Sequence, residues 1–421
     1  MQPISKPVLW MTVIALMLPW MASCAKEAPA PAVDGTFQKK LQEDLIRAKP
    51  GGVIELPAGK FQLDRPLSLT VDHVTLRGKG MDKTVLSFKG QKAGAEGLLV
   101  NVKGSVTLED LAIEDTKGDA LKVKDADGVI IRRVRTEWTN GPNPKNGSYG
   151  IYPVQCKNVL IEDSVALGAS DAGIYVGQSK NIIVRRNRAE LNVAGIEIEN
   201  SQDADVYENV ATRNTGGILV FDLPDLPVRG GRNTRVFNNQ VYSNNTENFA
   251  PKGNTVALVP TGTGVMIMAN DNIEVFKNTI QDHGTGNVMV ISYHATEKPI
   301  KDKLYDAYPE TIYIHDNIIT GGGTAPGGLL LKGLALAVGK PLPSILYDGI
   351  IDPKKADAAR RLPDHLRLCI KNNGAATFLN MDAGHTFKNI NRDLAPHDCA
   401  HPPIPPVVLA LPQAAPTVAG Q

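Results

Sequence analysis

A short element recurs through the middle of the chain, and in its clearest copies an aliphatic residue stands three positions before an asparagine. Aligning the copies gives one column of aliphatic residues: Leu76, Leu108, Ile131, Ile161, Val184, Val206, Val236, Val275 and Ile314. The steps between them are 32, 23, 30, 23, 22, 30, 39 and 39 residues, so insertions interrupt a base period of 22 to 23 residues. This period predicts a solenoid of stacked units, and the leucine and asparagine spacing of a leucine-rich repeat is missing.

Each unit is predicted to consist of short strands, because it is rich in β-branched residues and glycine and lacks helical periodicity. A first strand reads Gly-Ile-x-Val or Gly-Ile-x-Ile at 173–176, 195–198 and 217–220. The aliphatic column marks a second strand, and a short third strand such as Val210-Ala211 follows. We expect the asparagines of the turn to stack on one another and to bond the turn backbone. They are Asn187, Asn209, Asn239, Asn278 and Asn317.

This pattern resembles the right-handed parallel β-helix of pectate lyases and related carbohydrate-active proteins, from about Pro50–Leu63 to the C-terminal strands. The resemblance implies an all-β fold of about nine to eleven turns. The segment Thr36–Lys49 has Phe37, Leu41 and Leu45 at helical spacing, which predicts an amphipathic helix that caps the first turn. We expect residues 36–400 to form the β-helix with its cap and irregular final strands, and the proline-rich tail 401–421 to be loose.

The first residues have the character of an export signal. An apolar run, Val8–Trp20, is short for a membrane span and is followed by the small residues before Cys24. The MASC segment resembles a bacterial lipobox, so we expect a signal peptide at 1–23, acylation of Cys24 and a tether at 24–35. An ordinary cleaved signal peptide is the alternative.

Charge and cysteine content narrow the function. The 45 Lys and Arg residues balance 44 Asp and Glu residues, which gives no basic bias toward nucleic acid. In an oxidising compartment Cys369 and Cys399 can form a disulfide, with two free thiols as the alternative. Cys156 is expected to be a small buried side chain. No spacing indicates zinc or haem, and no cofactor is predicted.

Glu197 and Glu199 lie in the segment GIEIEN, where Ile196 and Ile198 alternate with them. Alternation turns the isoleucines into the core and the glutamates outward. Stacking of parallel turns then predicts two outward columns. The Glu197 column contains Leu99, Lys122, Tyr152, Tyr175, Glu197, Leu219, Met266 and Met289. The Glu199 column contains Asn101, Lys124, Val154, Gly177, Glu199, Phe221, Met268 and Ile291.

Long insertions border the first strand on both sides, at 136–149 and 242–263 before it and at 222–231 and 293–310 after it. Insertions at these borders build two walls, so the first strands are predicted to form the floor of a groove. The outward apolar residues Leu219, Phe221, Met266 and Met268 would be costly in water. We therefore expect the loop 223–231 or the loop 248–254 to cover them.

Carboxylates and aromatic rings in this groove would suit a sugar, whose hydroxyls bond acidic acceptors and whose ring faces stack on aromatics. The candidate binding residues are Lys122, Lys124, Trp138, Tyr149, Tyr152, Asp171 and Asp222. The lysines could bind the carboxylate of a uronic acid. A solvated ladder of Lys, Tyr and Glu side chains that pair across turns is the alternative, and Asp222 could instead be a loop anchor salt-bridged to Arg229 or Arg232.

Catalysis is a further hypothesis, with Glu197, Glu199, Tyr175 and His294 as the candidate residues. Glycoside hydrolysis needs two carboxylates about 5 to 10 Å apart. A uronate lyase or epimerase needs a group that neutralises the substrate carboxylate and a base such as tyrosine or histidine. His294 could equally be a surface residue, and calcium could bind Asp171, Glu197 and Glu199. The Asp-Pro-His-Glu segment of alginate epimerases and the Gly-His-Gly segment of polygalacturonases are missing.

The tracts GASDAGIYVGQSKNIIVRRN and AGIEIENSQDADVYENVATRNTGGILVFDLPDLP, together with the lipoprotein signal, resemble a bacterial family of parallel β-helix repeat-containing lipoproteins. The resemblance implies no established activity, and it implies a possible exported partner, a c-type cytochrome-like protein. We expect a lipid-anchored protein of the outer membrane, facing the periplasm or the cell surface, that binds or processes a polysaccharide. A noncatalytic assembly protein, or an accessory protein that meets a protein partner through the groove's Met, Phe and Leu side chains, is the alternative.

Overall fold

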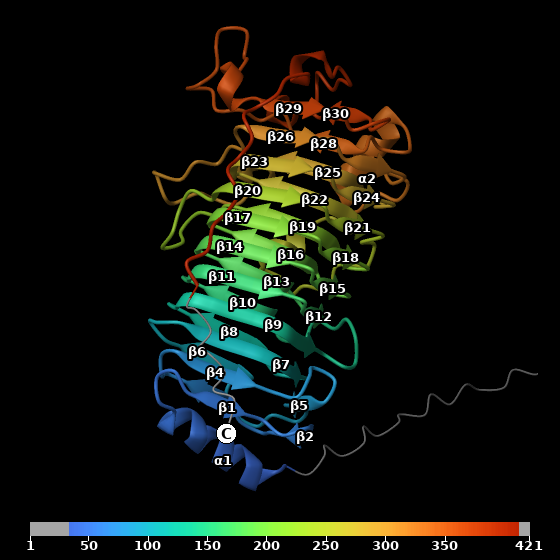
Figure 1. Cartoon of the computed structure of the whole chain (residues 1–421). Helices are drawn as coiled ribbons and strands as arrows, with labels where there is room; N and C mark the ends of the chain where they lie inside the picture. The colour runs from blue at the N-terminus through green and yellow to red at the C-terminus, as the bar shows by residue number, and fades with distance from the viewer. Residues whose placement is uncertain (1–32, 412–421) are drawn as a thin grey trace, which may run out of the picture.

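The predicted repeat forms a coil of parallel strands (Figure 1) in a computed structural model that describes residues 33–411. The first strands make one sheet of eleven. They are β3 (Leu67–Leu69), β6 (Leu98–Asn101), β8 (Leu121–Lys124), β10 (Tyr149–Val154), β13 (Ala172–Gly177), β16 (Ala194–Glu199), β19 (Gly216–Phe221), β22 (Thr263–Met268), β25 (Gly286–Ile291), β28 (Ile345–Tyr347) and β30 (Phe378–Asn380). All pairings within this sheet are parallel, so each strand starts a new turn of the β-helix.

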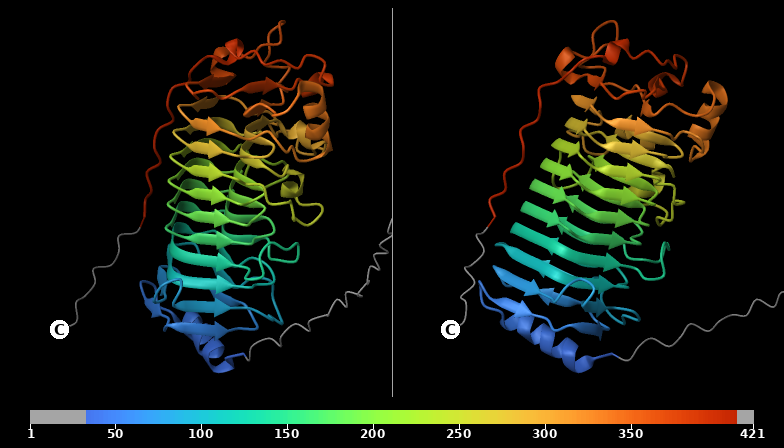
Figure 2. Two further views of the ribbon diagram at one scale, coloured as in Figure 1. Left: turned by 90° about the vertical axis from the view of Figure 1, so that its right-hand side faces the viewer. Right: turned by 45° about the vertical axis from the view of Figure 1, so that its right-hand side comes forward.

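The second and third strands form a sheet of nineteen on the other sides of the coil. They are β1 (Val53–Glu55), β2 (Gly59–Gln62), β4 (Val74–Arg77), β5 (Thr84–Ser87), β7 (Val106–Glu114), β9 (Asp127–Glu137), β11 (Lys157–Glu162), β12 (Val165–Leu167), β14 (Lys180–Arg185), β15 (Arg188–Glu190), β17 (Gln202–Tyr207), β18 (Val210–Thr212), β20 (Arg232–Phe237), β21 (Gln240–Tyr242), β23 (Asp271–Phe276), β24 (Thr279–Gln281), β26 (Ile312–His315), β27 (Ile318–Thr320) and β29 (Leu368–Lys371). Figure 2 shows the strands of successive turns lying directly above one another.

The register confirms the alignment made from the sequence. Strand pairing joins Leu76 to Leu108 and continues through every member of the aliphatic column to Ile314. One further member lies at each end. Ile54 is one base period of 22 residues before Leu76, although the alignment left it out, and Ile370 is 56 residues after Ile314. These side chains fill the interior of the coil and form one continuous apolar core.

Two asparagine ladders hold the turns. In the predicted ladder, Nδ2 of Asn187 donates to Oδ1 of Asn209 at 3.0 Å, and the pattern continues to Asn373. A second ladder, which the sequence analysis missed, runs through Asn192, Asn214 and Asn244 at the end of the third strands. Each amide also bonds buried backbone, so the ladders supply the partners that these turns require.

Helix α1 (Gly35–Arg47) covers the first turn as predicted. Leu41 and Leu45 are buried, and the ring of Phe37 stacks on Phe61 at 3.7 Å between centroids. At the other end, β29 and β30 match the expected final strands, whereas α2 (Leu329–Val338) and β28 were not foreseen. The remaining elements are the short 3-10 helices Thr255–Leu258, Tyr293–Thr296, Asp364–Leu366, Ala383–His385 and Ala395–His397.

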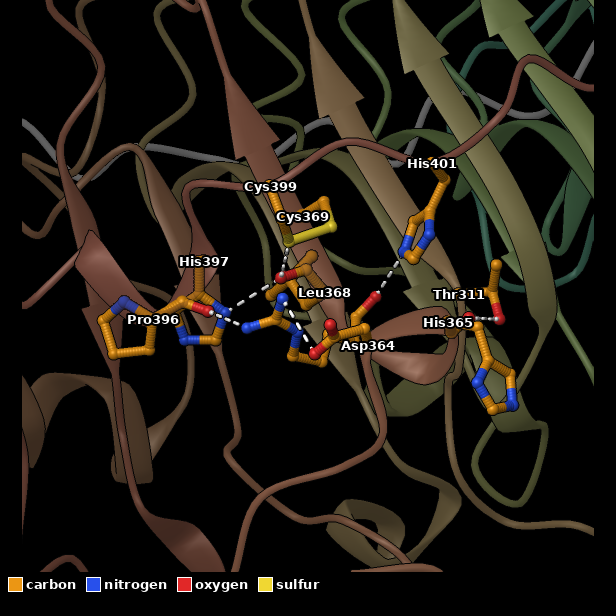
Figure 3. Close-up of a disulfide and its surroundings, with 10 residues drawn as sticks. Thr311, Asp364, His365, Leu368, Cys369, Pro396, His397, Cys399 and His401 are labelled. Carbon is orange, nitrogen blue, oxygen red and sulfur yellow. Dashed lines mark hydrogen bonds and ion pairs between the residues drawn. A yellow bond between two sulfur atoms is a disulfide. The ribbon is translucent and has the colours of Figure 1, made fainter.

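The tail is not loose over its described part. After the disulfide between Cys369 and Cys399, it turns at His401, whose Nε2 bonds the carbonyl of Arg367 at 2.8 Å (Figure 3). Residues 401–411 then run along the outer face of the second strands (Figure 2). Backbone N–H groups of Ile404, Val407 and Ala410 donate there.

The acceptors of these three bonds are Glu274 on β23, Asp205 on β17 and Asn158 on β11, at 3.2, 3.1 and 3.1 Å. Each acceptor lies two turns from the next. Three residues of polyproline II chain advance about 9.3 Å, which matches two turns at about 4.8 Å each. Pro405 and Pro406 lie between the first two donors, and Pro402 and Pro403 precede the first. Because proline has no N–H to satisfy, the segment 401–411 suits a strap across the coil.

The segments for which export features are predicted, namely the signal peptide at 1–23, the lipidated Cys24 and most of the tether, lie outside the described residues. Within residues 33–411, neither helix combines the length and the apolar character needed to cross a bilayer.

Candidate functional site

The two glutamates of GIEIEN lie where the alternation predicted, on the outer face of β16. Strand pairing places Tyr175 beside Glu197 on one side and Leu219 on the other. Neither glutamate is solvated, since Glu197 is 1% exposed and Glu199 is 9% exposed. The alternative of a solvated side-chain ladder is therefore wrong at this turn.

Loops on both sides of β16 enclose a cleft of about 490 Å³. One wall comes from the loop before β10, and the others come from the loop after β19 and the loop before β22. The lining residues are Ser148, Tyr149, Asp171, Glu197, Glu199, Leu223, Pro224, Asp225, Leu226, Gly253, Asn254, Thr255, Val256 and Tyr293. The lining thus contains four carboxylates and no lysine, arginine or histidine.

The carboxylates at the base of the cleft differ in their partners. The hydroxyl of Tyr175 donates to Oε1 of Glu199 at 2.5 Å, and Nδ2 of Asn254 donates to Oδ2 of Asp171 at 3.0 Å. Oε2 of Glu197 is buried and accepts no hydrogen bond from any described residue. A buried acceptor without a donor is costly, which marks Glu197 as the group with capacity left for a ligand.

Burial dominates the protonation of these groups. It raises the pKa of Glu199 to about 7, against the opposing effect of the Tyr175 hydrogen bond. Burial and the nearby Glu199 raise the pKa of Asp171 to about 7. The pKa of Glu197 is raised well above its ordinary value by burial and then by the charges of Glu199 and Asp171. Neighbouring carboxyl groups with different environments can hold and release protons near neutral pH.

Three tyrosines form an aromatic cluster beside the carboxylates. The ring centroids of Tyr149, Tyr152 and Tyr175 lie 4.4 to 4.9 Å from one another. Burial raises the pKa of each hydroxyl further above 10, so all three remain protonated donors. Tyr149 lines the cleft, and Tyr175 supports it through Glu199.

Trp138 does not form the predicted aromatic platform. Its side chain is 5% exposed and packs into the main core, and its Nε1 donates to the carbonyl of Thr116 at 2.7 Å. With its ring inside the coil, it offers no face to a sugar. The sequence placed it in a loop, but the loop turns this residue inward at the end of β9.

His294 also lies away from the carboxylates. It is exposed on a 3-10 helix, with its ring 5.2 Å from that of Tyr308, while the neighbouring Tyr293 faces the cleft. Lys122 and Lys124 lie on β8, three turns from Glu197, and neither lines the cleft. Nζ of Lys122 pairs instead with Asp119 at 3.3 Å.

Asp222 anchors its loop, although not through the predicted salt bridge. Its Oδ1 accepts the backbone N–H of Gly231 at 2.7 Å, whereas Arg229 pairs with Asp302 and Arg232 bonds Gln202. Asp222 does not line the cleft, and burial raises its pKa to about 7. The charge of Asp222 is one of the causes of the raised pKa of Glu199. Asp222 thus influences the protonation of Glu199 without lining the cleft.

The outward apolar residues next to the glutamates are covered, as expected from their character. Leu219, Phe221, Met266 and Met268 are buried in a second cluster that the loops complete with Leu223, Phe249, Val256 and Val259. Leu331 and Leu334 of α2 belong to the same cluster. This stretch is therefore not an open surface for a protein partner, and the groove is closed beyond Glu197 and Glu199.

Several cleft residues carried no sequence signal. Asn254, Thr255 and Tyr293 come from long insertions, and only the closed loop conformations bring them to β16. Cys156 is buried as expected, and burial raises the pKa of its thiol to about 12. Among the described residues, no three His, Cys, Asp or Glu side chains are arranged to hold a metal ion.

Comparisons with known proteins agree on the fold. Residues 79–227 match a family model described as "Right handed beta helix region". A search of curated proteins found no match. Among solved structures, the A-module of the Azotobacter vinelandii mannuronan C-5 epimerase AlgE4 superposes with a TM-score of 0.52 at 17% identity, covering 81% of this chain and 91% of that one.

The catalytic unit of a GH87 α-1,3-glucanase from Streptomyces thermodiastaticus superposes with a TM-score of 0.51 at 16% identity, covering 75% of this chain and 53% of that chain. At such identities the likeness concerns the fold. The coil is thus a right-handed parallel β-helix, as the sequence pattern predicted.

Proposed function

We propose that this right-handed β-helix protein binds a polysaccharide in the cleft over β16 and cleaves it by hydrolysis. The observation that carries the proposal is the group of Asp171, Glu197 and Glu199, which are buried together beside a tyrosine cluster in a cleft of about 490 Å³. Carboxylates supply acceptors for sugar hydroxyls, and tyrosines supply ring surface and donors. The cleft volume lies within the range of about 300 to 1,000 Å³ usual for ligand sites.

The fold is compatible with this function. The two similar structures described above are named as a mannuronan C-5 epimerase and an α-1,3-glucanase, both of which act on polysaccharides. Their substrates are not transferred to this chain. The proposal depends on the side chains of its own cleft.

The two glutamates are suited to different roles. Glu197, with its pKa raised most strongly and no hydrogen-bond donor, is suited to hold a proton and act as general acid. Glu199 accepts the hydroxyl of Tyr175, which favours its charged form, so it is suited to act as base or nucleophile. Residues i and i+2 of a strand have Cα atoms about 6.6 Å apart, a spacing compatible with paired carboxylates in glycosidases.

Lyase or epimerase chemistry is less well supported. Those reactions need a group that neutralises the uronate carboxylate next to the base. The cleft lining has no lysine, arginine or histidine, and Lys122 and Lys124 lie three turns away. A uronate at the glutamates would face uncompensated negative charge, so we do not retain the uronate as the reacting sugar.

Export, lipid anchoring at Cys24 and residence at the outer membrane belong to the proposal, as does an exported protein partner such as a c-type cytochrome-like protein. A polysaccharide substrate would meet the cleft outside the cytoplasm. Calcium is not needed for the acid and base roles assigned to Glu197 and Glu199. Adding calcium or a chelator to the product assay described next tests whether it changes the rate.

The test is product analysis after incubation with neutral polysaccharides of different linkage. We expect new reducing ends with the wild-type protein and a rate at least a hundredfold lower with Glu197→Gln and with Glu199→Gln, since each removes one of two required groups. Glu247→Gln, at an exposed position outside the cleft lining, is the matched control. Equal rates in all four proteins would refute the catalytic roles, and products with an unsaturated end would indicate a lyase instead.

A further inference from the structure

The cleft carboxylates differ from most other buried carboxylates of the described residues in having no cationic partner. Asp222 and Asp348 also lack one, but each accepts backbone N–H groups instead. Glu109 forms salt bridges with Arg77 and Arg132, and Asp205 forms one with Arg235. Further buried acids with a basic partner are Glu114, Glu162, Glu190, Glu274 and Glu310. A buried acid normally needs such a partner, because an unpaired charge in a low-dielectric interior is costly.

At the cleft the cations are missing. No salt bridge involves Asp171, Glu197, Glu199 or Asp225, all of which line it. Lys298, a half-buried residue outside the lining, contacts one wall, where its Nζ donates to Oγ1 of Thr255 at 3.4 Å. Glu199 and Asp171, whose pKa values lie at about 7, therefore have no internal counterion when they ionise.

A second observation is the unused acceptor at the base of this cleft. Oε2 of Glu197 has no hydrogen-bond donor, although its side chain is 99% buried and belongs to the lining. Oε1 of Glu199 and Oδ2 of Asp171 each have one. A ligand that brought a charged donor to this point would satisfy the acceptor, which a protonated Glu197 also presents, and would offset the charge of Glu199 beside it.

We infer that the cleft selects glycans that carry a free, protonated amine, namely polymers of de-N-acetylated amino sugars, and that the ammonium group lies against Glu197 and Glu199. The inference rests on the proposed function, because it names the substrate class of the same cleft. A uronate would add a further negative charge, and a neutral sugar would leave the carboxylates unpaired. An ammonium group supplies both the charge and the donors that the lining lacks.

Glu197 lines the cleft but is only 1% exposed, so movement of one wall would ease entry of the ammonium group. The wall at 253–256 is held to the floor by the bond from Asn254 to Asp171. The variant Asn254→Ala removes this bond and adds no charged group, and it favours the protonated form of Asp171, because the lost bond stabilised the charged form. It is expected to raise the association rate for the amine-bearing glycan.

The experiment is calorimetric titration with pairs of oligosaccharides that differ only at the amine. The probes are oligomers of glucosamine and galactosamine, the same oligomers after N-acetylation, a neutral glucan oligomer and an oligouronate. We expect at least tenfold tighter binding of an amine-bearing oligomer than of its acetylated counterpart. We expect that preference to disappear in Glu197→Gln/Glu199→Gln and to persist in Glu247→Gln.

The possible results distinguish the preference for an amine from glycan binding itself. Binding of neutral or acetylated oligomers with no preference for the amine, or preferred binding of the oligouronate, would overturn the inference and leave glycan binding in place. No binding of any glycan by the folded wild-type protein would overturn both. A circular dichroism spectrum of the double variant that matches the wild type ensures that a lost preference reports on charge and not on unfolding.

Discussion

Replacing Glu199 by glutamine removes a buried negative charge while retaining an oxygen that can accept the hydroxyl of Tyr175. The pKa of Glu199 rises from 4.5 to about 7 in the folded protein because of burial. A difference of one pKa unit corresponds to about 1.4 kcal/mol. The charged form of Glu199 therefore lowers the free energy of unfolding by roughly 3 kcal/mol once the side chain is fully ionised.

The sign of the pH dependence follows from the raised pKa. Between pH 4.5 and about 7 the folded state binds more protons at Glu199 than the unfolded state does, so stability falls as the pH rises through this window. Below the window the side chain is neutral in both states. We thus expect Glu199→Gln to match the wild type at pH 4.5 and to be more stable by about 3 kcal/mol at pH 8.

Urea unfolding followed by circular dichroism at pH 4.5, 6, 7 and 8 measures this difference. Glu247→Gln is the control, and its difference from the wild type is expected to be small at every pH because Glu247 is exposed. A Glu199→Gln variant that is less stable than the wild type at pH 8, or a difference that does not change with pH, would refute the electrostatic account of the cleft.

Three further predictions concern the stability of the β-helix that carries the site. Trp138→Phe should lower the free energy of unfolding by about 1–3 kcal/mol in thermal or urea melts, because it leaves the buried carbonyl of Thr116 without its donor. Glycan affinity should stay unchanged, and a loss of affinity would indicate that Trp138 contacts the sugar. Asn239→Ala should cost at least about 3 kcal/mol, because Asn239 makes four ladder bonds, whereas Gln240→Ala at the exposed neighbouring position should be nearly neutral. Deletion of 401–421 should destabilise the coil by about 1–3 kcal/mol, because it removes the three N–H bonds of the strap, the bond from Arg235 to the carbonyl of Ile404 and the bond of His401 to Arg367. An unchanged melting temperature would show that the strap contributes nothing.

The core and the strand register could be predicted from the sequence because they depend on local alternation and on a constant period. Once Ile196 and Ile198 point inward, Glu197 and Glu199 must point outward. Stacking of equal turns then fixes their neighbours as Tyr175 and Leu219, as strand pairing confirms. No long-range information is needed for this step.

The chemistry of the site depends on loop conformation, which the period does not encode. The sequence could show that long loops border β16, but it could not show that Asn254 would bond Asp171 across 83 residues or that Trp138 would turn inward. The strap was missed for a different reason. Proline-rich composition is typical of a loose tail, and only the match of three residues to two turns reveals that the tail can dock.

The central claim is that the cleft at Glu197 and Glu199 binds a glycan. The most direct test is binding of the soluble form, residues 25–421, to a panel of basic, neutral and acidic polysaccharides, with Glu197→Gln/Glu199→Gln as the comparison. The account predicts binding to at least one member of the panel and at least tenfold weaker binding by the double variant. Absence of binding to every glycan, or equal binding by the two proteins, would contradict it.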